Sequence, residues 1–382
     1  MTYLDNSATT RFDDRVRAAM EPYLGERFGN ASSIHSLGRE AHVALEAARS
    51  VIAKTIGADS AEIVFTSGGT EANNYAIKGS IFSEIKKGKV FSDLSILTSS
   101  IEHHSVLEPI EFLTSLGVRS FFTEVDSDGI IMLDQIPSDL TLASIMYVNN
   151  EVGSINDIQN ITQKIRLASP HALIHSDGVQ AFGKIHFDVH QLGVDLLSIS
   201  AHKIHGPKGI GALYIRRGVQ IEPLLHGGSQ ERNRRGGTEP VALSVGFAEA
   251  ARLVSEEFDD RARHIKQLRE YLLAKLSEMS EVVINSSSAN KSVDAIINIS
   301  FTSEILQRLD SEALIINFDL AGIAVSNGSA CTSGTLQPSH VLLAMGKGKE
   351  IAAKSLRVSL SKDTTISNID LFSVALHKII HQ

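Results

Sequence analysis

Six short apolar runs, alternating with segments of helical periodicity, constrain the fold of this chain more than any other feature. They lie at residues 63–66, 94–98, 143–148, 173–175, 196–199 and 211–215. Residues 41–56, before the first run, and 158–168, before the fourth, repeat apolar side chains with the period of an amphipathic helix. Strands that are apolar throughout are typical of a parallel sheet covered by helices on both faces. The alternation therefore predicts an α/β fold built on a mostly parallel sheet.

The pattern changes in the last third of the chain. Residues 249–279 form a long, charge-rich amphipathic segment, which is typical of a helix that connects two domains. Short strands at 295–301 and 355–360, with helices at 311–321 and 366–380, are expected after it. Because the chain has 382 residues and is 43% apolar, it is long enough for two domains.

Charge and hydropathy narrow the classes of function. The formal net charge is −8 and no basic tract is present, so direct nucleic-acid binding is not expected. No stretch reaches the roughly 18 apolar residues that a membrane span needs. The first ten residues lack the basic and apolar regions of a signal peptide. We therefore expect a soluble, cytoplasmic protein without a membrane partner.

The single cysteine, Cys331, is either a packing residue or a chemical one. One cysteine excludes a disulfide within the chain and a metal site built from several cysteines. Free cysteines are often buried for packing alone. However, Cys331 lies in the segment Asn327-Gly328-Ser329-Ala330-Cys331-Thr332-Ser333-Gly334, which is rich in small residues and poor in core formers. That context favours a loop with a chemical role.

Residues 66–72 have the layout of a phosphate-binding turn. The sequence Thr-Ser-Gly-Gly-Thr-Glu-Ala follows an expected strand and opens an expected helix. Glycines such as Gly69 let the backbone approach an anion, amide groups at the helix start point toward it, and the Thr70 hydroxyl adds a donor. A capped helix after a glycine turn is the alternative interpretation.

Two expected strands end on groups that suit one cofactor. Residues 173–177 end on Asp177, and residues 196–203 end on Lys203. Ligands of open parallel sheets collect at the carboxyl ends of the strands, so both side chains can face one site. Pyridoxal phosphate (PLP) needs a lysine amine to hold its aldehyde and an acid to keep its pyridine nitrogen protonated. A solvated surface lysine is the alternative, which the nearby His202 and the phosphate turn disfavour.

Further polar residues follow other strand ends. His103 comes after the run at 94–98, where an imidazole can stack on a pyridine ring. Asn150 follows the run at 143–148, and Gln180 lies three residues after Asp177, where amides can hydrogen-bond a ring hydroxyl. For His103 the alternative is a metal ligand or a hydrogen-bonded histidine of a turn, and for the two amides the alternative is turn capping. The histidine clusters at 102–104 and 202–205 lack the spacing of a helical zinc site, so no resident metal is expected.

Taken together, these motifs resemble the cysteine desulfurases of the NifS/IscS-like class, which are fold type I PLP enzymes. The resemblance is collinear and spans nearly the whole chain. Its motifs fall at residues 4–10, 28–30, 66–74, 102–103, 148–153, 200–209, 235–238, 329–333 and 356–360. It implies a large domain with a mostly parallel seven-stranded sheet and a smaller α+β domain. The implied division is 15–255 for the large PLP-binding domain, and 1–14 with 256–382 for the small domain that carries the Cys331 loop.

The resemblance implies a role for each site residue. Lys203 holds the cofactor, and Cys331 takes the sulfur of L-cysteine as a persulfide while L-alanine is released. His103 stacks on the ring and is our candidate acid–base group. The other implied cofactor residues are Gly69, Thr70, Asn150, Asp177, Gln180, Ser200, His202 and Thr238. The implied substrate residues are Asn30, Asn150 and Arg357, of which Arg357 grips the carboxylate.

The resemblance also implies partners. Thr238 matches a position that the family supplies from the neighbouring subunit, which implies a homodimer with composite sites. A sulfur acceptor is implied as well, such as an iron–sulfur scaffold, a tRNA-thiolation enzyme or the DNA-phosphorothioation machinery, and Cys331 is able to ligate an iron–sulfur cluster transiently. Selenocysteine lyase, aminotransferase or another PLP activity of the same fold is the alternative function. A cofactor-binding scaffold without turnover is the non-enzymatic alternative.

Overall fold

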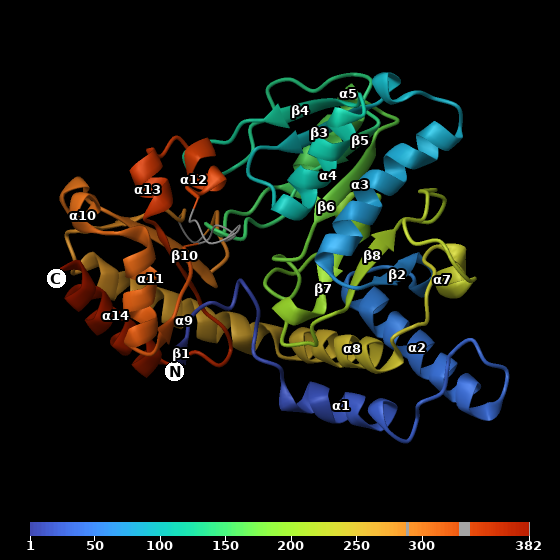
Figure 1. Ribbon diagram of the computed structural model, residues 1–382, viewed down its shortest axis with the longest axis horizontal. Coiled ribbons are helices and arrows are strands. Elements are labelled where there is room, and N and C mark those ends of the chain that lie inside the picture. Colours follow the sequence, from blue (N-terminus) through green and yellow to red (C-terminus); the bar gives the residue numbers. More distant parts are fainter. Residues whose placement is uncertain (288–289, 328–336, 382) are drawn as a thin grey trace.

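The computed structural model describes residues 1–287, 290–327 and 337–381, and its largest element is a seven-stranded sheet (Figure 1). In spatial order the strands are β2 (Ile63–Thr66), β8 (Gly211–Ile215), β7 (Leu196–Ser200), β6 (Leu173–Asp177), β5 (Leu142–Ser144), β3 (Ser95–Ser99) and β4 (Arg119–Thr123). All neighbours are parallel except β8, which runs antiparallel to β2 and β7. The expected α/β fold with a mostly parallel sheet is confirmed.

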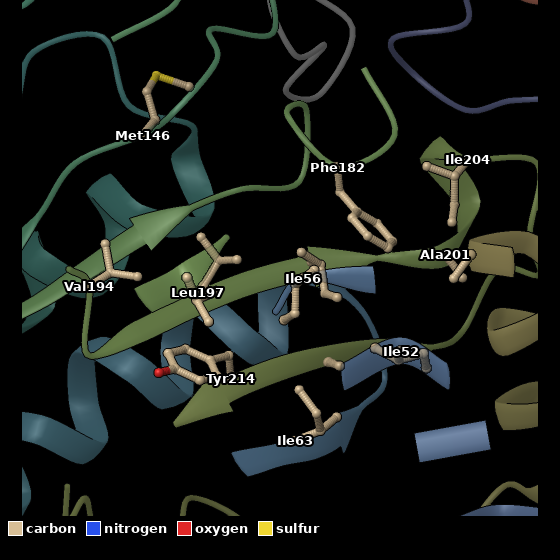
Figure 2. Close-up of a cluster of buried hydrophobic side chains, with 14 of the residues drawn as sticks. Ile52, Ile56, Ile63, Met146, Phe182, Val194, Leu197, Ala201, Ile204 and Tyr214 are labelled. Atoms are coloured by element: carbon tan, nitrogen blue, oxygen red, sulfur yellow. The ribbon is translucent and has the colours of Figure 1, made fainter. Parts of the chain in front are cut away.

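Helices cover both faces of this sheet, which explains why its strands are apolar throughout. The helices of this part are α1 (Asp14–Leu24), α2 (Ser36–Thr55), α3 (Gly69–Lys86), α4 (His104–Ser115), α5 (Ile158–Ala168), α6 (Val189–Leu192), α7 (Gln230–Asn233) and α8 (Val241–Glu256). On one face Ile52 of α2 and Ile56, directly after this helix, pack with Ile63 and Tyr214 of the sheet (Figure 2). On the other face, Val64 packs against α3. Successive residues of β2 therefore belong to two different cores.

A second, separate core lies in the C-terminal third. The antiparallel sheet there has the order β12 (Leu356–Ser359), β10 (Ile296–Phe301) and β9 (Val282–Ile284), and β1 (Thr2–Tyr3) pairs in parallel with β11 (Ile323–Ala324). The helices are α9 (Phe258–Ser277), α10 (Ser303–Arg308), α11 (Ser311–Leu320), α12 (His340–Ala344), α13 (Lys349–Ala353) and α14 (Ile366–Ile380). Leu4 is buried in this core with Phe318 and Phe372, so the N-terminus lies beside the C-terminal elements (Figure 1). The division into 15–255 and 1–14 with 256–382 stays a prediction.

Two details differ from the sequence expectations. The single helix expected at 249–279 is two helices, because Glu257 between α8 and α9 leaves the helical conformation with φ −100° and ψ 10°. Its carboxylate pairs with Arg15 and Arg261. Strand β4 was not expected, because it is an edge strand whose first four residues are exposed or half-buried. None of the described helices is long and apolar enough to cross a membrane.

Candidate active site

A pocket opens at the carboxyl ends of β6 and β7, beside the start of α3. It gathers most of the residues that the sequence singles out, from segments that are far apart in the chain. Its lining includes Gly69, Thr70, His103, Asn150, Asp177, Gln180, Ser200, His202, Lys203 and Arg357. The rule that ligands collect at the ends of parallel strands therefore locates this pocket correctly.

Lys203 ends the single helical turn that follows β7. Its Nζ atom donates to the main-chain carbonyls of Ser7 and Ala8, the latter at 2.8 Å, so the N-terminal segment forms one wall of the pocket. Burial, together with the positive charge of Arg357, lowers the pKa of Lys203 to about 8. A larger fraction of this lysine is therefore the free amine at neutral pH than for an exposed lysine, and the free amine is the form that attacks an aldehyde.

Asp177 is the last residue of β6 and is held at both carboxylate oxygens. Its Oδ1 accepts from the main-chain N–H of Val179 at 2.9 Å, and its Oδ2 accepts from Asn73 Nδ2 at 2.8 Å. Asn73 also donates to the hydroxyl of Ser105 at 2.8 Å. These contacts fix the orientation of a buried acid in the pocket, as a partner for a protonated pyridine nitrogen requires.

His103 caps the N-terminus of α4 and lines the pocket. Its Nδ1 accepts from the main-chain N–H of Ser105 at 3.1 Å, so the neutral ring carries its proton on Nε2. Burial lowers the pKa of His103, although the nearby Asp177 charge opposes this shift. A neutral, oriented imidazole suits a ring that stacks on a planar cofactor.

The pocket end next to α3 fits a phosphate group. Gly69 opens this 18-residue helix, and a Cβ there would lie 2.8 Å from a methyl carbon of Val179. The Ser200 hydroxyl is buried and finds no hydrogen-bond partner among the residues that the structure describes. His202 lies nearby, and burial lowers its pKa to about 4. Its ring is therefore neutral, and the N–H of a neutral imidazole can donate a hydrogen bond. A helix start, an unsatisfied hydroxyl and Thr70 therefore present donors to an anion. With Lys203 and Asp177, these residues fit PLP.

Arg357 is buried but keeps donors available. Its Nη2 pairs with Asp5 Oδ1 at 2.7 Å, and its Nη1 donates to the main-chain carbonyl of Asn150 at 3.0 Å. Its Nε has no partner within the described part of the chain. The guanidinium is thus oriented toward the pocket with capacity to bind a carboxylate. Sequence reasoning did not assign a role to Asp5, although Asp5 lies in the motif at residues 4–10.

Two predicted residues lie away from the pocket. Asn30 and Thr238 are both exposed and do not line it. Their segments meet on the surface, because Ser32 bonds Asn30 Oδ1 through its amide at 2.9 Å and Glu239 through its hydroxyl at 3.4 Å. Cys331 lies outside the described residues.

Other lining residues were missed at the sequence level. Asn73 lies one helical turn after Gly69 and Thr70, a spacing that could have placed it on the same face. His340 also lines the pocket, where its Nε2 lies 2.9 Å from the main-chain oxygen of Glu102. No sequence signal links His340 to Glu102, because the two residues are 238 positions apart in the chain.

Comparison with known proteins agrees with this geometry. Residues 2–372 match the family described as "Aminotransferase class-V". The cysteine desulfurase IscS of Dictyoglomus turgidum is 45% identical over 386 residues, which cover 100% of this chain and 94% of that protein. The solved structure of a NifS-like protein has a TM-score of 0.90 and 37% identity, with 100% and 99% of the two chains covered. A structure of SspA in complex with cysteine has a TM-score of 0.81 and 33% identity, with 96% and 100% covered. The chain therefore belongs to the class-V aminotransferase family, within its NifS/IscS-like group.

Proposed function

We propose that this chain is a PLP-dependent cysteine desulfurase, which converts L-cysteine to L-alanine and passes the sulfur to Cys331. The observation that carries this proposal is the pocket that joins Asp177 and Lys203, at the ends of the neighbouring strands β6 and β7, with Arg357 of β12. An amine, an acid and a guanidinium in this arrangement serve a cofactor aldehyde, a pyridine nitrogen and an amino-acid carboxylate. The similarity to proteins described as cysteine desulfurases supports the same reaction.

Each residue has a part in the reaction. PLP, when bound, supplies an electron sink that makes the substrate Cα–H acidic. Lys203 Nζ moves the proton at that carbon, while Arg357 holds the carboxylate. The Cys331 thiolate attacks the substrate sulfur, so that an S–S bond forms as the C–S bond breaks, and a persulfide remains on Cys331. His103 is the proposed group that takes or returns the proton of the thiol.

The substitution Cys331→Ser tests the reaction. We expect this variant to bind PLP normally and to lose alanine and sulfide release from cysteine, because its hydroxyl cannot carry the sulfur. The substitution Lys203→Ala should prevent covalent attachment of the cofactor. Desulfuration that persists in Cys331→Ser would contradict the proposal, and transamination or selenocysteine cleavage by that variant would favour the alternative activities.

We infer a homodimer in which Asn30 and Thr238 complete the partner's pocket. Both residues lie outside the pocket of their own chain and share one surface. That surface also exposes large apolar side chains, Phe28 at 71% and Ile34 at 92%. Exposed apolar groups of this size next to functional polar residues are typical of an interface.

Mixed dimers test this arrangement. Chains with Lys203→Ala and chains with Thr238→Asp should each be inactive, because one lacks the amine and the other places a negative charge beside the partner's phosphate site. After co-refolding, a mixed dimer has one intact pocket, so about a quarter of wild-type activity should return under random pairing. A mixture that stays inactive would contradict the shared site.

We further propose that this protein acts in the cytoplasm and delivers its persulfide sulfur to an acceptor protein, such as an iron–sulfur scaffold or a thiolation enzyme. The proposed reaction leaves the sulfur on a side chain, from which a second thiol must remove it. Cysteine labelled with ³⁵S, incubated with the enzyme and candidate acceptors, should transfer label to the acceptor. The variant Cys331→Ser should transfer none.

A further inference from the structure

Lys184 lies behind the pocket, in a position that the reaction as described does not use. It lines a second cavity, on the side of Lys203 toward α9. Lys203 lines both cavities, so the two spaces meet at the reactive amine. Lys184 therefore lies close enough to the site to act on it through one intervening residue.

That intervening residue is Gln180, whose amide is held at both ends. Lys184 Nζ donates to Gln180 Oε1 at 3.0 Å, and Gln180 Nε2 donates to the main-chain carbonyl of Ser7 at 2.9 Å. An ammonium group can only donate, and a carbonyl can only accept. If the amide were reversed, its nitrogen would face the Lys184 ammonium, so that two donors would meet. Its oxygen would face the Ser7 carbonyl, so that two acceptors would meet. While Lys184 is protonated, Lys184 and Ser7 together permit one orientation of the Gln180 amide.

Lys184 differs from Arg261 and Lys362, two other cations that line its cavity. Arg261 pairs with Glu257 at 2.7 Å, and Lys362 pairs with Asp13 at 3.3 Å. Within the described part of the chain, no carboxylate lies within ion-pair distance of Lys184. Burial and the charge of Lys203 lower the pKa of Lys184 to about 7. Burying an amine without a counter-charge costs free energy of folding. The hydrogen bond to Gln180 gives a reason for Lys184 to occupy this position despite that cost.

We propose that Lys184 is a positioning residue, which locks the Gln180 amide so that its nitrogen, a donor, faces the cofactor pocket. The second N–H of Gln180 Nε2 is then available to an acceptor there, and the ring hydroxyl oxygen of PLP is such an acceptor when ionised. A reversed Gln180 amide would instead place its own oxygen, which is an acceptor, against the hydroxyl oxygen of PLP. This inference rests on the proposed function, because it takes PLP as the occupant of the pocket.

The substitution Lys184→Met tests the inference, with Lys184→Arg as the matched control. Methionine keeps the length of the side chain but cannot donate, whereas arginine still donates. We expect Lys184→Met to weaken PLP binding by about three- to ten-fold, the value of one hydrogen bond, and to move the pH midpoint of the bound cofactor's absorption change upward. Lys184→Arg should stay close to wild type in both measurements.

A second variant keeps the test valid if Lys184→Met does not fold. Lys184→Gln retains a polar partner, but its amide accepts as well as donates, so it no longer dictates the orientation of Gln180. We expect changes in the same direction. In a Gln180→Met background, Lys184→Met should add little, because the group that it positions is gone.

The outcomes separate this inference from the proposed function. Unchanged PLP affinity and absorption in Lys184→Met, or in Lys184→Gln if the first does not fold, would overturn the positioning role. Fully additive effects with Gln180→Met would overturn it as well. If the wild-type protein binds PLP but releases no alanine from cysteine, the proposed function fails while the effect of Lys184 on the cofactor remains measurable.

Discussion

The amine of Lys203 lies among other basic groups, Arg357, Lys184 and His202. The charge of Lys203 lowers the pKa of both Lys184 and His202, and the charge of Arg357 lowers the pKa of Lys203. Asp177 opposes the last effect only in part. Burial is the larger cause of all three lowered pKa values, and the mutual repulsion adds to it, so His202 is neutral near pH 7 while the remaining positive charge favours an anionic ligand.

We expect the apoprotein to attach PLP at a rate that rises with pH and levels off above about pH 8. Only the neutral amine attacks the aldehyde, and a pKa lowered from 10.5 to about 8 makes Lys203 mostly neutral well below the pH at which an exposed lysine loses its proton. Stopped-flow absorbance between about pH 6 and pH 10 measures this rate. A rate that still rises steeply at the upper end would contradict the lowered pKa.

Glu102 is a buried acid that should make stability depend on pH. It is 0% exposed, its Oε1 accepts from the Ser99 hydroxyl and the Met146 amide, and burial raises its pKa to about 8. Between pH 4.5 and 8 the folded state keeps a proton that the unfolded state loses, so stability falls as pH rises.

The variant Glu102→Gln should therefore lose less stability than the wild type when the pH is raised from about 5 to about 8. The amide keeps an oxygen for both donors and has no proton to lose. Thermal unfolding at the two pH values measures the difference. As a control, Glu108→Gln changes a side chain that is 70% exposed and should leave the wild-type pH dependence intact.

At the scale of elements, the sequence best predicts those features that depend on the pattern of residues close together in the chain. The end of β6 that carries Asp177 and the end of β7 that precedes the turn with Lys203 follow from apolar runs that end on polar residues, and the start of α3 follows from Gly68 and Gly69. The contact of Arg357 with Asp5 joins residues that are far apart in the chain, so no local sequence pattern predicts it. The same holds for the carbonyl of Ser7 beneath Gln180, because only the folded chain brings the two together.

One element departs from ordinary backbone conformation. Glu231, Arg232 and Asn233 have φ values of 47°, 57° and 63°, a left-handed turn that costs about 1–2 kcal/mol per residue. Glu231 is buried and binds Arg49 of α2 through two hydrogen bonds of 2.6 and 2.9 Å. It also accepts from the Phe65 amide at 3.0 Å. These contacts offset the strain and fix the segment that leads to Thr238.

The substitution Glu231→Gln should destabilise the protein by about 3 kcal/mol, because it leaves the buried Arg49 with only the half-buried Glu46 as a counter-charge. Urea denaturation of the apoprotein measures this change. The matched control is Asp260→Asn, which removes the partner of Arg263 in an ion pair whose side chains are 66% and 83% exposed, and should cost under about 1 kcal/mol. Similar losses in both variants would contradict the role of the buried pair.

At the scale of the whole molecule, the chain crosses between its two cores more than once. Leu4, near the N-terminus, lies in the core of the C-terminal elements. Val341 and Leu342 of α12 and Ala352 of α13 lie in the core of the large sheet, although β11 before them and β12 after them belong to the other core. The pocket lies where these segments meet, so its geometry depends on both cores.

The proposed dimer predicts the effect of a charge on its surface. Ile34 is 92% exposed in the single chain, and the proposed dimer interface covers it. Ile34→Glu should shift the protein from dimer to monomer, because it places a charge in that interface. Light scattering after size-exclusion chromatography measures the mass. Val374→Glu is the control, since Val374 is 70% exposed on α14, and this variant should remain a dimer.

The backbone bridge between Ser326 and Arg357 sets a limit on where sulfur can be delivered. Ser326 lines the pocket, and its carbonyl accepts from the Arg357 amide at 2.6 Å. Cys331 follows it by five residues, and a chain of that length spans at most roughly 18 Å. An acceptor must therefore bring its own thiol to the neighbourhood of this pocket, and a longer or shorter connection at this point would change which acceptors are within reach.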